Sequence, residues 1–160
     1  MGIDYIRNSA GQIAQWNGMN VYLPETYSNE YQPIYDLFTT KPDVSVADAQ
    51  NTMVSSLVGA GLWDRMDIFY LFANNASDNA LINWKNPGTY DADKVGASEF
   101  TTMEGYEGST GDFISTNFIP ASNGVNYALD SAGIGIYPRF DIQENNYLFG
   151  GASNTRCRFR

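Results

Sequence analysis

The chain has 160 residues, enough for one domain with a substantial core, and its hydrophobic content of 43% and aromatic content of 14% predict that it folds. A formal net charge of -9 disfavours nucleic acid and anionic membrane surfaces as partners, and no apolar run is long enough to insert as a transmembrane helix. The absence of histidine excludes imidazole catalysis, and a single cysteine, Cys157, excludes an internal disulfide.

Residues 1–42 mix aromatic side chains with Asn, Gln and Pro, and no hydrophobic period persists. Residues 12–23 predict a short hairpin with Asn17-Gly18 as its turn, and the chain past Pro24 predicts an extended or irregular arm. We expect this arm either to anchor the chain to another protein or to pack on its own domain, and the two alternatives carry equal weight. The aromatic residues that would do so are Trp16, Tyr22, Tyr27, Tyr31 and Tyr35.

Residues 43–62 are the clearest helix, because apolar residues recur at three- and four-residue spacing. Asp43 or Ser45 is placed to cap its start, and Gly59 and Gly61 to stop it. A second turn is expected over 62–67, which makes 43–65 a helical connector. The apolar positions of the helix are Val46, Ala49, Met53, Val54 and Leu57.

Residues 68–73, Ile-Phe-Tyr-Leu-Phe-Ala, form a continuous apolar run that predicts a strand buried on both faces. The preceding helix would brace this strand, with Trp63 and Met66 in the corner between them. Beyond residue 80, short extended runs alternate with turns. Strands are expected over 80–87, in two runs within 99–120, over 132–140 and in two runs within 145–160, with a loop at 88–98.

This alternation favours a mainly β domain, a sandwich or jelly roll, over residues 66–160. The predicted organisation is therefore an arm at 1–42, a connector at 43–65 and a β-sandwich module at 66–160.

A series of motifs between about 44 and 150 resembles a module of bacteriophage and prophage virion proteins. In order, they are Leu62-Trp63, Met66-Asp67, Phe69 to Ala73, Ala80 to Pro87, Gly105 to Gly108, Thr116 to Pro120 and Asp130 to Tyr137. The resemblance implies a laminin-G or concanavalin-like β-sandwich in a head fibre, tail fibre or decoration protein. It also implies a place in the virion after synthesis in the bacterial cytoplasm. The implied partners are other capsid, tail or fibre subunits, further copies of the chain, and a host-surface polysaccharide.

Proteins with this module usually continue past the last strand expected here. Either the chain is the ordered part of a longer fibre protein, or partner chains complete its sheets. The arm at 1–42 lies outside the resemblance and would suit an anchor that docks the module to the particle.

Carboxylates at Glu99, Glu104 and Glu107, near Asp112, are candidates for glycosidase chemistry. However, a spacing of three puts Glu104 and Glu107 on opposite sides of a strand. No catalytic residue is therefore predicted, and a non-enzymatic role is favoured.

Two oxygen-rich segments are candidates for calcium. Residues 91–96 begin like a calcium loop, but Val95 stands where an oxygen ligand is needed. Residues 74–79 contain Asn74, Asn75 and Asn79, although solvated turns are the favoured interpretation. No cofactor is predicted, with calcium as the alternative.

Exposed aromatic residues beside amides are typical of sugar-binding faces. Trp84 with Asn83 and Asn86, together with Tyr90, forms one such candidate platform, and Tyr106, among glycines, is another. Core packing is favoured for Trp84. These residues carry the alternative function, a carbohydrate-binding module of a glycan-degrading system.

Overall fold

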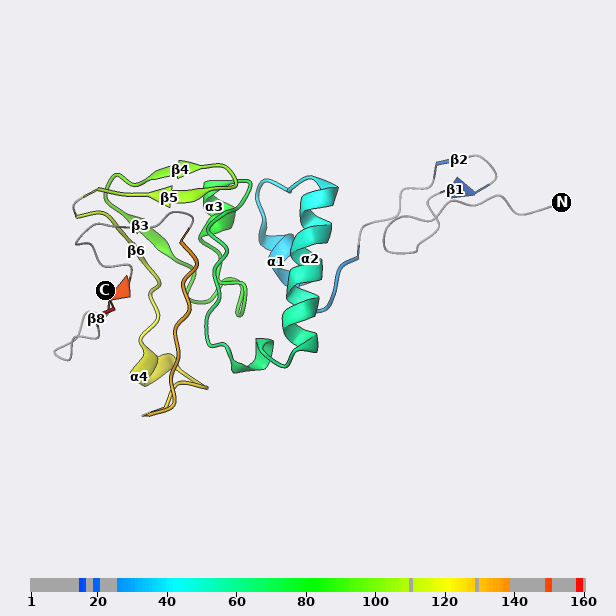
Figure 1. Ribbon diagram of the computed structural model, residues 1–160. Helices are drawn as coiled ribbons and strands as arrows, with labels where there is room; N and C mark the ends of the chain where they lie inside the picture. Colours follow the sequence, from blue (N-terminus) through cyan, green and yellow to red (C-terminus); the bar gives the residue numbers. More distant parts are fainter. Residues whose placement is uncertain are drawn as a thin grey trace.

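The computed structural model describes residues 26–109, 111–128 and 130–138. It also describes the backbone of four two-residue strands: β1 (Gln15–Trp16), β2 (Met19–Asn20), β7 (Phe149–Gly150) and β8 (Arg158–Phe159). Within the described ranges, helices α1 and α2 lie on one side, small antiparallel sheets lie on the other, and extended chain runs between them (Figure 1). At this level the fold is a mixture of helix and antiparallel strand. No helix in these ranges is long and apolar enough to cross a bilayer.

The helical side consists of α1 (Gln32–Leu37) and α2 (Val44–Gly59). Helix α2 confirms the predicted helix, and Asp43 occupies its N-cap position without a side-chain hydrogen bond. The buried face of α2 is rotated from the predicted one: Ala47, Gln50 and Val54 are buried, whereas Ala49 is exposed. Gln50 is tolerated inside because its Oε1 accepts a hydrogen bond from the Tyr31 hydroxyl.

Helix α2 ends where the glycines predict. The Leu62 N–H donates to the Leu57 carbonyl, and the Gly61 N–H donates to the Val58 carbonyl, both at 2.9 Å. This is a Schellman arrangement, which needs a left-handed residue after the helix. Gly61 supplies it with a φ of +66°. The short 3₁₀ helix η1 (Trp63–Arg65) follows and confirms the predicted second turn.

An aromatic core joins the helices to the chain beyond them. The indole ring of Trp84 lies at its centre, with ring centroids of Tyr31, Phe38 and Phe69 at 5.8, 6.2 and 6.0 Å. Burial of such rings contributes both apolar area and favourable edge-on contacts. The buried members of the core are Tyr31, Ile34, Phe38, Ala47, Val54, Trp63, Ile82 and Trp84.

This core corrects the predicted arm. Tyr31 is completely buried, and Tyr27 and Tyr35 pack against the core as partly buried residues. These three residues pack on the chain's own domain, which was one of the two alternatives. The prediction of an extended or irregular arm is wrong from residue 26 onward, because these residues pack against the core and α1 forms among them. The division at residue 42 likewise cuts through one packed unit. The predicted hairpin is confirmed in the pairing of Gln15 with Asn20 and Trp16 with Met19. The side chains of Trp16 and Tyr22 lie outside the described residues.

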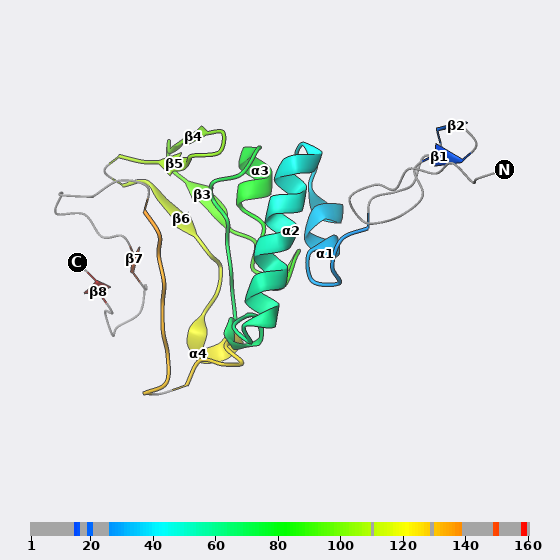
Figure 2. The same cartoon turned by 45° about the vertical axis from the view of Figure 1, so that its right-hand side comes forward.

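Residues 67–73, which we call the central segment, also differ from the prediction. The expected interior strand over 68–73 belongs to no sheet among the described residues, and its side chains are only partly buried. The chain is nevertheless neither helical nor freely exposed. Its backbone is held mainly by side chains from elsewhere, so an apolar run that reads as a strand becomes an extended connector between two layers (Figure 2).

Two small sheets form beyond the central segment. β3 (Asp93–Val95) pairs with β6 (Phe113–Ser115), and β4 (Glu99–Thr101) pairs with β5 (Gly105–Glu107), all antiparallel. The prediction of extended chain within 99–120 is confirmed in part, because three short strands form there instead of two runs, and β5 begins at Gly105. The pairing of β7 with β8 confirms the two runs within 145–160.

Three other element predictions are wrong. The loop predicted at 88–98 contains β3. Residues 80–87 form turns after helix α3 (Ser77–Ala80) rather than a strand, and residues 132–138 join no ladder among the described residues. Asparagines around α3 supply local hydrogen bonds that compete with a sheet. A last helix, α4 (Pro120–Asn123), follows β6.

Candidate functional site

The central segment divides its side chains between two apolar clusters. Phe69 and Leu71 pack against the helical core. Tyr70 and Phe72 stack on each other, with centroids 5.7 Å apart and rings 2° from parallel. Phe72 also meets the ring of Tyr106 edge-on at 6.2 Å. Such alternation is typical of an extended chain with one apolar layer on each side. The predicted contacts on both faces are therefore confirmed, whereas the predicted pairing of this segment in a sheet is not.

A buried amide, Asn83, holds the middle of the central segment. Its Oδ1 accepts hydrogen bonds from the N–H groups of Phe69 and Lys85, at 3.1 and 3.2 Å, and its Nδ2 donates to the Thr89 carbonyl. The adjacent backbone bond runs from the Trp84 N–H to the Phe69 carbonyl at 2.7 Å. Asn83 has no exposed surface. It therefore takes the place of a neighbouring strand at this point.

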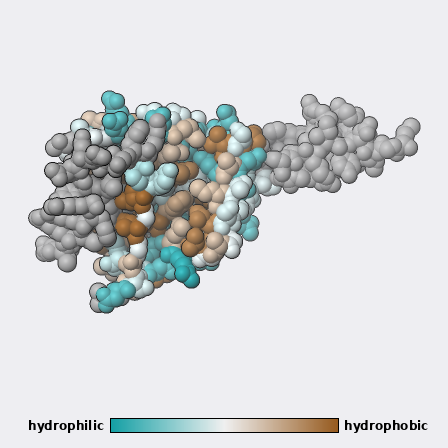
Figure 3. Space-filling model, in the orientation of Figure 1, coloured by the Kyte–Doolittle hydropathy of each residue, from teal (hydrophilic) through white to brown (hydrophobic). Residues whose placement is uncertain are grey.

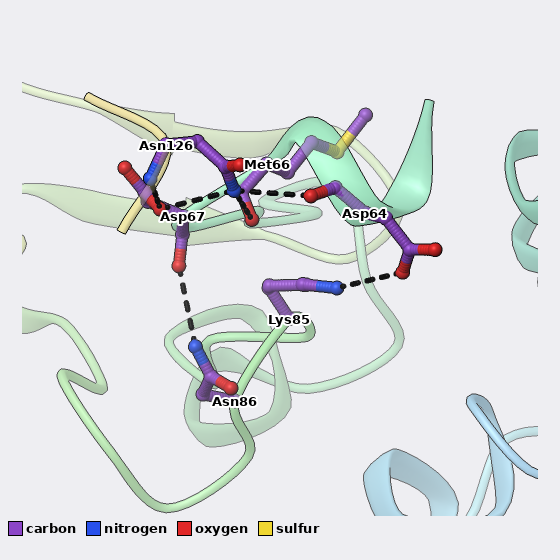
Figure 4. Close-up of polar contacts among 6 residues, drawn as sticks. All are labelled: Asp64, Met66, Asp67, Lys85, Asn86 and Asn126. Carbon is purple, nitrogen blue, oxygen red and sulfur yellow. Dashed lines mark hydrogen bonds and ion pairs between the residues drawn. The ribbon is translucent and has the colours of Figure 1, made fainter. Parts of the chain in front are cut away.

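A carboxylate, Asp67, holds the start of the central segment (Figure 4). Its oxygens accept hydrogen bonds from the backbone N–H groups of Val125, Asn126 and Tyr127, at 2.8 to 3.0 Å. The Asn126 side-chain amide donates back to the carbonyls of Asp64 and Met66. We call this arrangement the Asp67 clamp.

The environment of Asp67 shifts its pKa. Burial alone raises the pKa of the carboxyl, but the hydrogen bonds from Asn126, Val125 and Tyr127 together hold it below its usual range. Nearby, Lys85 lies 3.6 Å from the exposed Asp64 carboxylate and over the ring of Trp63. Asp67 thus ties the central segment to residues nearly sixty positions away in the sequence, which is a structural use of its charge.

Amide groups of the segment 74–79 make hydrogen bonds within the chain, while the buried Asn79 Oδ1 has no hydrogen-bond partner among the described residues. The Asn75 and Asn79 amides both donate to the Thr40 carbonyl, and Asn79 also donates to Asn75 Oδ1. Asn74 Oδ1 accepts from the Asn75 N–H and from the side chain of Gln50. These oxygens and amides dock α3 against the helical side. Among the described residues, no group of three acidic, histidine or cysteine side chains gathers to hold a metal ion.

The candidate glycan platform is not assembled as predicted. Trp84 is completely buried in the core, so it offers no face to a sugar ring, and the favoured interpretation of this residue is confirmed. Asn86 is exposed and donates to the Asp67 carbonyl at 3.3 Å, and Tyr90 is partly exposed. The Tyr90 ring meets Phe118 edge-on at 5.5 Å. Tyr106 is partly buried, and its hydroxyl donates to the Ser77 carbonyl.

The carboxylates weighed as catalysts lie on the small sheets. Glu99 and Glu107 are directly opposite each other across β4 and β5, while Glu104 lies in the turn between those strands. Asp112 accepts hydrogen bonds from the N–H groups of Ala97 and Ser109, which lower the pKa of its carboxyl. Asp112 thereby pins the loop before β6 to the turn that follows β3.

The surface after β6 differs from the rest of the chain. From Phe113 to Pro138 the sequence has one charged residue, Asp130, although charged residues make up 17% of the whole. Large apolar side chains are exposed there, notably Ile134, Ile136 and Tyr137. Apolar patches, separated by paler and hydrophilic ones, lie on the face between the grey atoms on the left and α2 (Figure 3). Uncharged surface with exposed apolar side chains is typical of a protein contact.

Two of these features were missed in the sequence. The Asp67 clamp gives no local signal, because its partners lie far apart in the chain. The uncharged stretch was detectable from composition alone, since a run without Lys, Arg, Glu or Asp is visible in the letters.

No protein family, curated protein or solved structure matches the chain. Function is therefore argued from these contacts and from the motifs themselves.

Proposed function

We propose that the chain is a non-enzymatic structural subunit of a phage virion, in a head fibre, tail fibre or decoration protein. The observation that carries the proposal is the use made of the motif residues. Asp67, Phe69, Asn83, Trp84 and Asn86 belong to the motifs that resemble virion modules, and all five meet at the central segment. These motif residues hold one segment of the chain against another, and such a structural use suits a building block of a particle.

The perturbed ionisable groups support the same proposal. Burial raises the pKa of the Tyr31 and Tyr70 hydroxyls, and each hydroxyl donates a hydrogen bond that joins two elements. The carboxyls of Asp67 and Asp112 have lowered pKa values because they accept backbone N–H groups of neighbouring loops. In a catalytic site such shifted groups face a substrate, whereas these four are engaged in the fold.

The finer architecture belongs to the proposal as well. Two-stranded sheets are marginal alone, and their free edges favour pairing with further strands. The sheets β3–β6 and β4–β5 are each two-stranded. We therefore take residues 66–160 as part of a concanavalin-like sandwich whose layers are completed by other strands in the particle. Trp16 and Tyr22, whose side chains are not described, are the remaining anchor candidates.

The test is the composition of particles. Phage particles induced from a strain that carries the gene would be purified by density gradient and digested for quantitative mass spectrometry. We expect the chain at a fixed ratio to the major capsid protein, retained after a high-salt wash. A peptide signal confined to the unassembled lysate would contradict a structural role in the virion.

Host-surface adhesion is a separate part of the proposal, carried by Asn86 and Tyr90. The two residues flank the turn closed by the Thr89 N–H to the Asn86 carbonyl at 2.9 Å, and both keep exposed surface. A glycan array would show binding that Tyr90→Ala reduces and that Tyr137→Ala, an exposed aromatic elsewhere, leaves unchanged. A blank array would remove adhesion, together with the alternative of a carbohydrate-binding module, and leave the particle role standing.

A further inference from the structure

We propose that two copies of the chain associate through residues 132–137, pairing these segments antiparallel about a twofold axis at Gly135. The inference deepens the proposed function by naming one assembly partner, and it rests on that function only for its biological setting. Its physical basis is the segment itself, Ala-Gly-Ile-Gly-Ile-Tyr.

No residue in the described ranges pairs with the backbone of this segment. Residues 132–138 run extended, and in both ribbon views the central segment lies between them and α2 (Figures 1 and 2). Within the ranges that the structure describes, their N–H and C=O groups make no hydrogen bond, and the nearest bond is from the Ser131 N–H to the Ala128 carbonyl. An extended edge of this kind is a template for strand addition.

The side chains suit a pairing of the segment with itself. Ile134 and Ile136 are 46% and 48% exposed, and they share one face of an extended chain because they are two residues apart. An antiparallel twofold at Gly135 places Ile134 opposite Ile136 of a second copy, and it does so twice. Such cross-strand apolar pairs are the usual source of stabilisation between strands. Gly133 and Gly135 have open space on the other face, so two backbones can approach closely.

The charge distribution allows a second copy to occupy this edge without repulsion. The chain carries a net charge of -9, so two copies repel each other wherever their carboxylates face. Residues 131–138 contain no charged residue, and they are therefore a place where like-charged copies can meet. A basic partner would instead be drawn to the acidic surfaces elsewhere and would gain nothing from an uncharged edge.

The first test measures mass in solution. Light scattering on the full chain over a concentration series should give the mass of two copies, and Ile134→Lys with Ile136→Lys should halve it. The matched control, Val44→Lys with Val58→Lys, adds the same charges at exposed positions of α2 and should remain a dimer. A wild-type monomer throughout the series, or a double variant at 134 and 136 that stays dimeric, overturns the proposal.

The second test reads the register and does not depend on the lysine variants folding. In a Cys157→Ser background, Gly135→Cys should cross-link to itself on mild oxidation, because residue 135 faces its own copy. Val125→Cys, at an 89% exposed position, should cross-link at least tenfold more slowly. Equal rates at 125 and 135 would contradict the register. Neither result depends on phage particles, so a monomer removes this contact without touching the particle test.

Discussion

The two ends of the described chain are stabilised in different ways. Residues 27–84 surround an aromatic core, and the buried amides of Asn79 and Asn83 bind backbone groups of other segments. Residues 113–138 expose many of their large apolar side chains and are joined to the rest of the chain by the pairing of β6 with β3 and by the Asp67 clamp. Apolar burial contributes most of the free energy of folding. We therefore expect the first region to contribute more to the free energy of folding than the second.

The largest test of this contrast is the removal of the central indole. Trp84→Ala should lower the free energy of unfolding by about 3 to 5 kcal/mol, because it leaves a cavity among the rings of Tyr31, Phe38 and Phe69. Urea denaturation followed by circular dichroism measures the change. Tyr137→Ala, at a 98% exposed residue of the second region, should change stability by less than about 0.5 kcal/mol. Comparable losses of unfolding free energy in the two variants would contradict the expectation that the first region contributes more of the stability.

A second test asks whether an amide replaces a strand. Asn83→Ala should cost about 1 to 3 kcal/mol, because the N–H groups of Phe69 and Lys85 lose their acceptor. Asn86→Ala is the matched control, since Asn86 is exposed and makes one long hydrogen bond to the Asp67 carbonyl. It should cost less than about 0.5 kcal/mol. If the two variants are equally stable, the central segment is held by its side chains alone.

The sequence predicts the first region only where a period is long enough to detect. Helix α2 was predictable because its apolar positions repeat over sixteen residues and Gly61 supplies a stop signal. Helix α1 was not, because six residues with Pro33 near the start carry too little pattern, although Tyr31 and Ile34 already mark its buried face. Local composition at 26–42 is that of a loop, and tertiary packing makes residues 32–37 a helix.

The central segment shows why element type and environment are separate predictions. Its apolar letters correctly indicate contacts on two sides, through Phe69 and Phe72. They cannot indicate that Asn83 would supply the hydrogen bonds of a neighbouring strand. Likewise, β3 was hidden in a loop prediction because three exposed residues have no apolar alternation. The Asp67 clamp depends on a contact across about sixty residues, which no local pattern encodes.

A third test separates the two regions by breaking the clamp. Asp67→Asn keeps the shape of the side chain but removes its charge, so the N–H groups of Val125, Asn126 and Tyr127 lose a charged acceptor. The cost at neutral pH should be about 1 kcal/mol once solvent screening is allowed for. Hydrogen exchange should rise at residues 125–127 and stay unchanged in α2. Faster exchange in α2 as well would show that the regions unfold as one unit.

The same clamp predicts a pH dependence of stability. Since the pKa of Asp67 is lower in the folded chain than in the unfolded one, its contribution is complete above the unfolded value and is lost as the pH falls through the folded value. The wild type should therefore lose more stability than Asp67→Asn between pH 6 and about pH 3. Asp64→Asn, at an exposed carboxylate beside Lys85, should behave like the wild type. Parallel pH profiles for wild type and Asp67→Asn would show that the clamp carries no charge effect.

The smallest expected change in stability is at the C-terminal end of α2, before η1 and the central segment. Gly59 and Gly61 both have open space where a Cβ would be added, so any difference between them arises from the backbone. Gly61 has a φ of +66°, and Gly61→Ala should cost about 1 kcal/mol. Gly59 is helical, and Gly59→Ala should instead stabilise by about 0.5 to 1 kcal/mol. Gly61→Asn should recover part of the loss, because asparagine tolerates the left-handed conformation better than alanine.

Opposite signs at two glycines only two residues apart would locate the helix end at the Schellman turn, which directs the chain into η1 and the core. Equal signs would mean that the turn is formed by packing of Leu62 and Trp63 rather than by the glycine.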